Sequence, residues 1–565
     1  MIKKILSIAA LNLMFTAGIT MAQGQTPEVS RSVSFKEPSA GACKLLQMKN
    51  GNTLFFHFSK KKGIEVAVFD TKHKMSPIVN NHVESFKTKQ LGTSDFKGLF
   101  EINGQALLFL VRYEHRSPLL YRFTFDGKSG KLIEEKVVGE IEKLPITAGY
   151  AVVYGGVGLP SFDVKKDPES DYYAVATINT FAHESNARIK ITHYSPEHKV
   201  INEGNYASPK NKYKYLNLLE MYVHGDEYVF LTTFGYNTAK SGGKDSKVFV
   251  SRLSKGSKDI AGEYMSSARS IESPIVGLKY NAVNKQLYML SGVNAKSIGL
   301  EHTMYSADGN MVLKMNTIDP ASLKISPDAF VKHPELSSYA QKNLKYKNPY
   351  TGVIQDFRLH EDGTATIMFE ELEAKVSTSS YMSASGSFSS STHTSTRLGD
   401  IGVVRVSADG KEMPGSYAIA KSQFTNGWLS PYYLYRRAET GWNYNRGAFK
   451  GGANNNNFFS FDYMYVNDKA YAIYNDFSEN IEREDENYRG RKKMRGVSDA
   501  NTVLAWYDGE KIQRSYLFGD PGNKDIARFS RIDMNTHSAD EKSFATLMIE
   551  RKGRKKEAYI VWVKF

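Results

Sequence analysis

The 565-residue sequence predicts an all-β fold, and three observations support this class. Strand-forming aromatic residues are abundant, with 34 Tyr and 31 Phe, and almost no long segment places apolar residues at helical spacing. Short alternating runs are separated by Asn-Gly or Asp-Gly pairs, which favour tight hairpins. Groups of such runs recur at intervals of about 50 to 100 residues. Repeated sheets of this kind predict a single β-propeller of about eight four-stranded sheets, or blades.

The clearest group lies between residues 356 and 422. Its first hairpin turns at Asp362-Gly363 and its second at Asp409-Gly410, with alternating apolar and polar residues on either side. We label the strands of each blade A to D from the centre of the ring outward. This group supplies all four strands of one blade, with a Ser/Thr-rich insert, 375–397, between strands B and C. The composition of the insert is that of a flexible tract, so we expect it to lack a fixed shape.

The other groups begin near residues 43, 96, 161, 216, 274, 458 and 529. The third is irregular, so seven blades are the alternative if it is a decorated connection. In the fifth group, Asp319-Pro320 is expected to form a turn before an outer strand at 322–326.

The last group contains only three strands and ends at Phe565, whereas residues 30–37 form an unassigned strand before the first group. We therefore expect the N-terminal strand to complete the last blade and to close the ring. The runner-up fold is an outer-membrane β-barrel, because short turns alternating with long loops also fit that architecture.

The first 22 residues have the pattern of a secretory signal peptide. Lys3 and Lys4 precede an apolar run, and a small-x-small site ends at Ala22. We expect a mature chain of residues 23–565 that folds as one propeller domain, located in the periplasm, on the cell surface or outside the cell. No other stretch has the length of apolar sequence that a spanning helix requires. The single cysteine, Cys43, cannot form an internal disulfide, so packing must hold the domain together.

The formal net charge of +14 favours anionic partners. In a propeller the A–B and C–D turns lie on one face, and the B–C and D–A connections lie on the other. The long insertions all fall in connections of the second kind, which makes this loop-bearing face the expected binding surface. One of these insertions, 333–347, has a helix-like sequence. Basic clusters fall there too, at Lys60–Lys62, Lys342–Lys347, Arg489–Arg495 and Arg551–Lys556, whereas several A–B turns are acidic.

The most unusual connection is 425–457. It combines aromatic residues, which stack on sugar rings, with arginines, which pair with carboxylates. A structural explanation is that the loop uses its aromatics to fasten itself to the ring. The candidate ligand-binding residues are Trp428, Tyr432, Tyr433, Tyr435, Arg436, Arg437, Trp442, Tyr444 and Arg446.

No known catalytic or metal-binding motif occurs, and the 13 histidines lack metal-ligand spacing. We therefore expect neither a metal nor a cofactor, and we assign no catalytic residue. The leading hypothesis is a non-enzymatic exported propeller, a monomer, that binds a protein or an anionic polysaccharide through its loop-bearing face. No nucleic-acid partner is expected, and peripheral membrane association is compatible with the charge. The alternative is a glycan-processing hydrolase or lyase in which Arg436, Arg437 and Arg446 hold an acidic sugar and Tyr444 or a loop carboxylate acts as acid or base.

Overall fold

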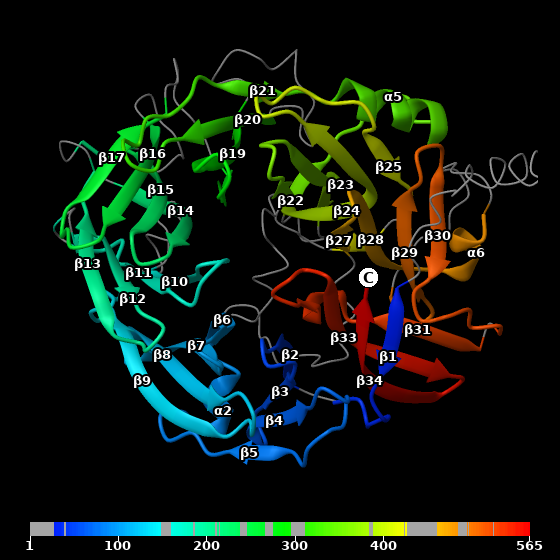
Figure 1. The fold of residues 1–565 in the computed structure, drawn as a ribbon, viewed down its shortest axis with the longest axis horizontal. Helices are drawn as coiled ribbons and strands as arrows, with labels where there is room; N and C mark the ends of the chain where they lie inside the picture. Colours follow the sequence, from blue (N-terminus) through cyan, green and yellow to red (C-terminus); the bar gives the residue numbers. More distant parts are fainter. Residues whose placement is uncertain are drawn as a thin grey trace, which may run out of the picture.

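A computed structural model shows eight antiparallel sheets arranged in a ring (Figure 1). It describes residues 27–38, 41–147, 160–182, 184, 187–208, 212–213, 215–237, 246–265, 275–294, 311–382, 388–422, 424–426, 460–483, 494, 496–523 and 525–565. The strands form eight separate sheets and no continuous closed sheet, so the barrel alternative is wrong. The irregular third group forms a regular blade, so the seven-blade alternative is also wrong.

The first four blades follow the chain in order. Blade 1 consists of β2 (Ala42–Gln47), β3 (Thr53–Ser59), β4 (Gly63–Phe69) and β5 (Val79–Asn81), and blade 2 of β6 (Asp95–Ile102), β7 (Gln105–Glu114), β8 (Ser117–Asp126) and β9 (Leu132–Glu140). Blade 3 consists of β10 (Ser161–Lys166), β11 (Tyr173–Ile178), β12 (Ile189–Tyr194) and β13 (Val200–Tyr206). Blade 4 consists of β14 (Tyr215–His224), β15 (Tyr228–Tyr236), β16 (Lys247–Ser254) and β17 (Ile260–Tyr264).

Blades 5 to 7 continue the same order. Blade 5 consists of β18 (Ile275–Asn281), β19 (Gln286–Asn294), β20 (Met311–Ile318) and β21 (Ala329–Val331). Blade 6 consists of β22 (Val353–Leu359), β23 (Ala365–Met382), β24 (Phe388–Val406) and β25 (Tyr417–Ile419), with β26 (Phe424–Asn426) added beside β24. Blade 7 consists of β27 (Asp462–Val466), β28 (Lys469–Asp476), β29 (Asn501–Tyr507) and β30 (Ile512–Tyr516). The helices of the described residues are α2 (Thr88–Leu91), α5 (Pro334–Asn343) and α6 (Ser478–Ile481), with a 3₁₀ turn, η5 (Ile532–Met534). None of these helices has the length and apolar character needed to cross a membrane.

Blade 8 joins the two ends of the chain. It contains β31 (Ile526–Ser530) with β32 (Thr536–His537), then β33 (Ser543–Lys552), β34 (Lys555–Lys564) and, outermost, β1 (Glu28–Arg31). Glu28 pairs with Lys564 and Arg31 with Val561, and β1 lies beside β34 in Figure 1. The predicted ring closure is therefore confirmed.

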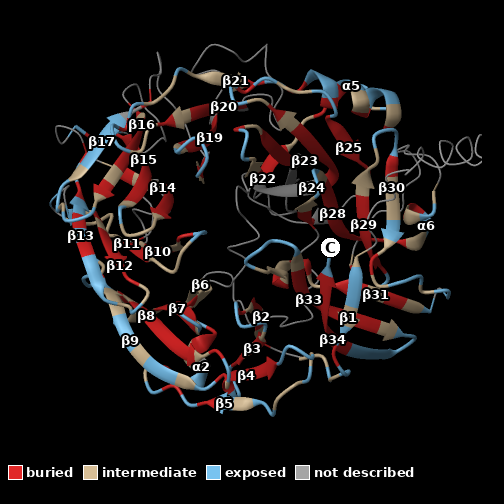
Figure 2. Cartoon of the chain, in the orientation of Figure 1, coloured by how far each residue is buried: buried red, intermediate tan, exposed pale blue. Residues whose placement is uncertain are grey.

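Each blade is apolar on both faces because it packs between two neighbours. Buried residues accordingly occur in the strands all around the ring in Figure 2. On β7, Ala106, Leu108 and Leu110 pack with blade 1. The intervening Leu107 and Phe109 pack with blade 3. Eight clusters of buried side chains fill the eight blade interfaces, so the core is a ring of interfaces. Cys43 is buried in the interface between blades 8 and 1.

Two local expectations are wrong. The Ser/Thr-rich insert was expected to lack a defined shape, but β23 and β24 stay paired from blade 6 out to Met382 and Phe388. The outer strand of blade 5 is β21, not 322–326, because Asp319 closes a turn over 319–324. Its carboxylate accepts a hydrogen bond from the Ser322 backbone N–H at 2.7 Å. The helix expected within 333–347 is present as α5.

Candidate functional site

The nine predicted ligand-binding residues, 428 to 446, lie outside the described residues, as do those of the basic cluster at 489–495. Both ends of the segment that carries the ligand-binding residues are described. Its start follows β25 in blade 6, and its end is Ser460, just before β27 in blade 7. The contacts of these two ends define the base of the candidate site, at the loop-bearing side of blades 6 and 7.

The first contact is a buried ion pair. Lys421 Nζ lies 2.9 Å from Glu370 Oε1, and the two side chains are 2% and 0% exposed. Ser460 Oγ donates a hydrogen bond to the other carboxylate oxygen of Glu370 at 2.8 Å. Glu370 on β23 therefore holds residues from both ends of the segment at one point.

The second contact centres on Asp400 of β24, which is fully buried. Its carboxylate accepts hydrogen bonds from the Lys421 backbone N–H at 3.0 Å and from the Tyr346 hydroxyl at 2.9 Å. The Tyr350 hydroxyl donates to the Asp400 backbone carbonyl at 2.8 Å. Burial, followed by the negative charges of Glu371 and Asp400, raises the pKa of Tyr350 well above its ordinary value, so this phenol stays protonated. The connection that follows α5 is thus fastened to the same base.

The third contact links blades 6 and 7. Asp476, at the end of β28, accepts hydrogen bonds from the Ser422 backbone N–H at 2.9 Å and from the Ser422 hydroxyl. Asn480 of α6 donates to Asp476 at 2.9 Å and to Ser422 Oγ at 2.7 Å. We call the set Glu370, Lys421, Ser460, Asp400, Ser422 and Asp476 the loop base.

The loop base is suited to support and not to reaction. Its charged groups are buried, and each carboxylate is engaged by protein donors at ordinary hydrogen-bond distances. Among the described residues, no group of three or more His, Cys, Asp or Glu side chains is placed to hold a metal ion. Sequence reasoning missed these residues, although Glu370 and Lys421 each interrupt an apolar strand pattern, which is a signal of a buried polar contact.

A second polar row follows the inner strands of blades 5 to 8. Asp356 of β22 lies 3.2 Å from Lys279 Nζ and accepts a hydrogen bond from the Tyr463 hydroxyl at 3.0 Å. Next along the ring, Asp462 accepts from Asn535 at 2.9 Å and lies 2.8 Å from His537 Nε2. These carboxylates join neighbouring blades. The arginines that the hydrolase or lyase alternative requires lie outside the described residues.

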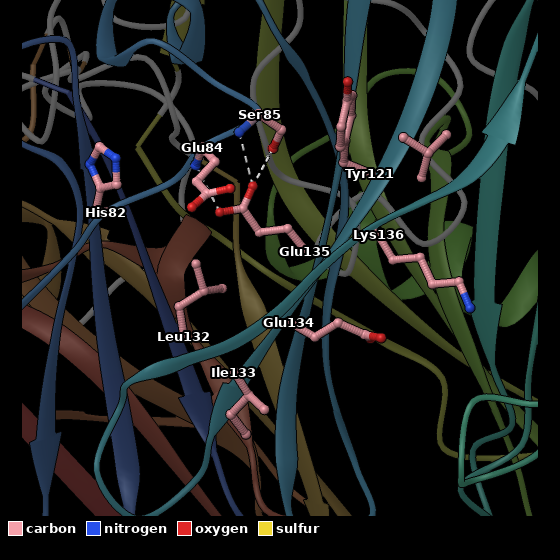
Figure 3. A pocket seen from close by; sticks show the side chains of 10 residues that line it. His82, Glu84, Ser85, Tyr121, Leu132, Ile133, Glu134, Glu135 and Lys136 are labelled. Atoms are coloured by element: carbon pink, nitrogen blue, oxygen red, sulfur yellow. Dashed lines mark hydrogen bonds between the residues drawn. The ribbon is translucent and has the colours of Figure 1, made fainter.

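A shallow pocket of about 620 Å³ lies away from this site, at the outer rim of blades 1 and 2 (Figure 3). Glu135 of β9 accepts hydrogen bonds there from the backbone N–H groups of Glu84 and Ser85, at 2.8 and 3.0 Å. Glu134 pairs with Arg122, and this contact lowers the pKa of its carboxyl group. Glu135 thus fastens the chain between β5 and α2 to blade 2, and we do not assign the pocket a ligand.

No protein-family model matches the chain, and no curated protein matches its sequence. Three of the similar solved structures are the polysaccharide lyase Uly1, the lectin BP39L from Burkholderia pseudomallei and the hydrazine synthase of Kuenenia stuttgartiensis. Their identities are 8%, 9% and 14%, with TM-scores of 0.36, 0.33 and 0.31. The alignments cover 83%, 84% and 62% of this chain, and 90%, 98% and 79% of the respective structures. At this distance the similarities bear on neither ligand nor reaction.

Proposed function

We propose that this chain is an exported, non-enzymatic β-propeller that binds an anionic polysaccharide on its loop-bearing face, through residues 428–446. Export rests on the N-terminal pattern of Lys3, Lys4 and the apolar run that ends at Ala22. The aromatic residues of the segment would stack on sugar rings, and Arg436, Arg437 and Arg446 would pair with acidic groups.

One observation carries the proposal: the two ends of the segment are held by the same buried carboxylate. Lys421 and Ser460 both contact Glu370, and Asp476 holds Ser422 beside them. A long connection whose ends are fastened to a rigid scaffold loses less entropy on binding than one with free ends. Buried anchors beneath a variable loop are therefore the arrangement expected of a binding surface.

A binding assay with the mature chain, residues 23–565, tests the proposal. We would measure the affinity for polygalacturonate, heparin and neutral dextran by calorimetry, with Trp428→Ala/Trp442→Ala as the test variant. Tyr228→Ala/Tyr280→Ala on blades 4 and 5 is the matched control, because these partly exposed aromatics lie on strands away from the loop base. We expect the test variant to bind an acidic polysaccharide at least about ten-fold more weakly than the wild type, and the control to bind normally.

Two outcomes would contradict the proposal. If the wild-type chain shortens the polysaccharide, seen as new reducing ends or an unsaturated product, the hydrolase or lyase alternative is correct. If none of the polysaccharides binds at low ionic strength, the glycan partner is wrong and a protein partner becomes the hypothesis to test.

A further inference from the structure

The B–C turns of three consecutive blades are basic. Lys60, Lys61 and Lys62 connect β3 to β4 in blade 1. Arg116 lies in the turn between β7 and β8 in blade 2, and Arg554 lies between β33 and β34 in blade 8, where Lys555 and Lys556 follow. Because blade 8 neighbours blade 1, these turns follow one another along the loop-bearing face. We call these seven residues the basic crescent.

The charges of the crescent are accessible. All seven residues are exposed, and the Lys62 side chain is 59% exposed even though it pairs with Glu65. Among the described residues, no ion pair involves Lys60, Lys61, Arg116, Arg554 or Lys555.

The acidic residues beside these turns are already engaged by other protein groups. Glu65 contacts His57 and Lys62, Glu550 contacts Arg528 and Lys552, Glu114 contacts Arg112, and Glu557 accepts a hydrogen bond from Tyr559. Glu65 therefore pairs with one crescent residue, Lys62, but these carboxylates form no ion pair with Lys60, Lys61, Arg116, Arg554 or Lys555, and the crescent keeps a net positive charge.

The opposite face provides a contrast. The A–B turn of blade 3 carries Asp167, Glu169 and Asp171, and that of blade 4 carries Asp226 and Glu227. Asp171 lies 2.7 Å from Nζ of Lys49, which belongs to the A–B turn of blade 1, and it accepts a hydrogen bond from the Asn103 backbone N–H. Lys49 on this face is therefore paired. Exposed lysines also occur on the opposite face, in the C–D turns of blades 1 to 3, but they share that face with these acidic A–B turns, whereas the B–C turns of blades 8, 1 and 2 carry basic residues in succession.

The composition of the crescent argues against two other classes of partner. The residues of its three turns include no aromatic side chain, which single-stranded nucleic acids use as a stacking platform, and no large apolar side chain to enter a lipid surface. Charges spread over three blades match a partner that repeats its anionic groups along an extended chain. We infer that the basic crescent is a second contact surface for the sulfate or carboxylate groups of an anionic polysaccharide, about a quarter to a half turn around the ring from the loop base. This inference rests on the proposed function, because it takes the ligand to be such a polysaccharide.

The test compares two charge reversals in the mature chain. The crescent variant is Lys60→Glu/Lys61→Glu/Arg554→Glu/Lys555→Glu. The matched control, Lys72→Glu/Lys128→Glu/Lys131→Glu/Lys199→Glu, makes the same change of charge at exposed residues in the C–D turns of blades 1 to 3. Binding to heparin and to polygalacturonate would be measured at about 50 and about 300 mM NaCl, where screening differs strongly. Thermal unfolding would confirm that both variants are folded.

We expect the crescent variant to bind at least about ten-fold more weakly at low salt, and the control to change affinity less than about three-fold. Equal weakening of both variants would overturn the inference, because it would report net charge alone. Binding of the wild type to anionic phospholipid vesicles but to neither polysaccharide would also overturn it. If the crescent variant binds normally while Trp428→Ala/Trp442→Ala does not, the inference fails and the proposed function stands. The reverse result would retain the crescent and refute the role of residues 428–446.

Discussion

At the scale of single residues, the decisive groups are charged side chains buried in otherwise apolar strands. Glu370 and Lys421 are almost fully buried, and their charged groups form an ion pair 2.9 Å apart. A buried pair adds little net stability, but removal of one member leaves an uncompensated charge in the core. The loop base therefore depends on both members being present.

Replacement of Lys421 by Met tests this dependence. We expect the free energy of unfolding to fall by about 3 to 5 kcal/mol, because Glu370 stays buried without its cation. The double variant Lys421→Met/Glu370→Leu should recover part of this loss. Urea unfolding of the three proteins measures both effects, and a single variant as stable as the wild type would show that Glu370 finds another partner.

Buried histidines predict a pH dependence. Burial lowers the pKa of His193 and His333 to about 4, and in His193 this outweighs the opposing effect of the Gly225 carbonyl 3.0 Å away. The unfolded chain, with histidine pKa values near 6.5, binds protons first as the pH falls. Stability is therefore complete above pH 6.5 and decreases toward pH 4, by about 2 kcal/mol per histidine between pH 7.5 and pH 5. Chemical unfolding at these two pH values measures the change in the free energy of unfolding. We expect His193→Gln to make this change smaller, and a variant with the same pH dependence as the wild type would contradict the role of His193.

At the scale of elements, the turns between strands C and D repeat one design. Asp70, Asp126, Asp319 and Asp508 each start such a turn, and their carboxylates accept backbone N–H hydrogen bonds from residues two to four positions later. A lysine closes each turn with its backbone carbonyl. This Asp-to-Lys pattern is visible in the sequence, and it indicates a turn over 319–324. The outer strand of blade 5 must then come later in the chain than 322–326, as β21 does.

The hairpin of β23 and β24 shows where composition misleads. Ser and Thr are typical of linkers, but here their backbone groups pair strand to strand as far as Met382 and Phe388. Alternation of apolar and polar residues, which reveals strands elsewhere, is weak in this Ser/Thr-rich segment.

Removal of the outer part of this hairpin should leave the propeller intact. We expect a chain in which 378–394 is replaced by a short Gly/Ser linker to keep its cooperative thermal transition within a few degrees of the wild type. The reason is that residues beyond Ser377 pair only with one another among the described strands. Differential scanning calorimetry measures this, and a loss of cooperativity would mean that the hairpin supports blade 6 or blade 7.

At the scale of the whole molecule, stability comes from eight similar interfaces that are complete only when the ring closes. The interface between blades 8 and 1 joins the ends of the chain: Trp562 of β34 donates a hydrogen bond to Thr53 of β3 at 2.8 Å and stacks on His73, with ring centroids 3.7 Å apart. The N-terminal strand covers the outer edge of β34, which would otherwise be open.

Much of this architecture could be predicted because strand alternation and turn pairs are local signals. The missing fourth strand of the last group and the unassigned 30–37 segment also identified the closure, although β1 begins two residues earlier than expected. The loop base could not be predicted, because pairing of Glu370 with Lys421 and Ser460 depends on how blades 6 and 7 meet. Local sequence does not encode which buried charges face one another.

The central claim is that the N-terminal strand closes a ring which then carries the binding face. Thermal unfolding and solution size of the mature chain lacking residues 23–38 test it most directly, with the shortened-hairpin chain as the control. The account predicts that this deletion exposes the outer edge of β34, the strand that carries the buried Val561 and Val563. The chain should then unfold at lower temperature, lose cooperativity or aggregate. A deletion variant that stays monomeric and unfolds at the temperature of the intact protein would contradict the account.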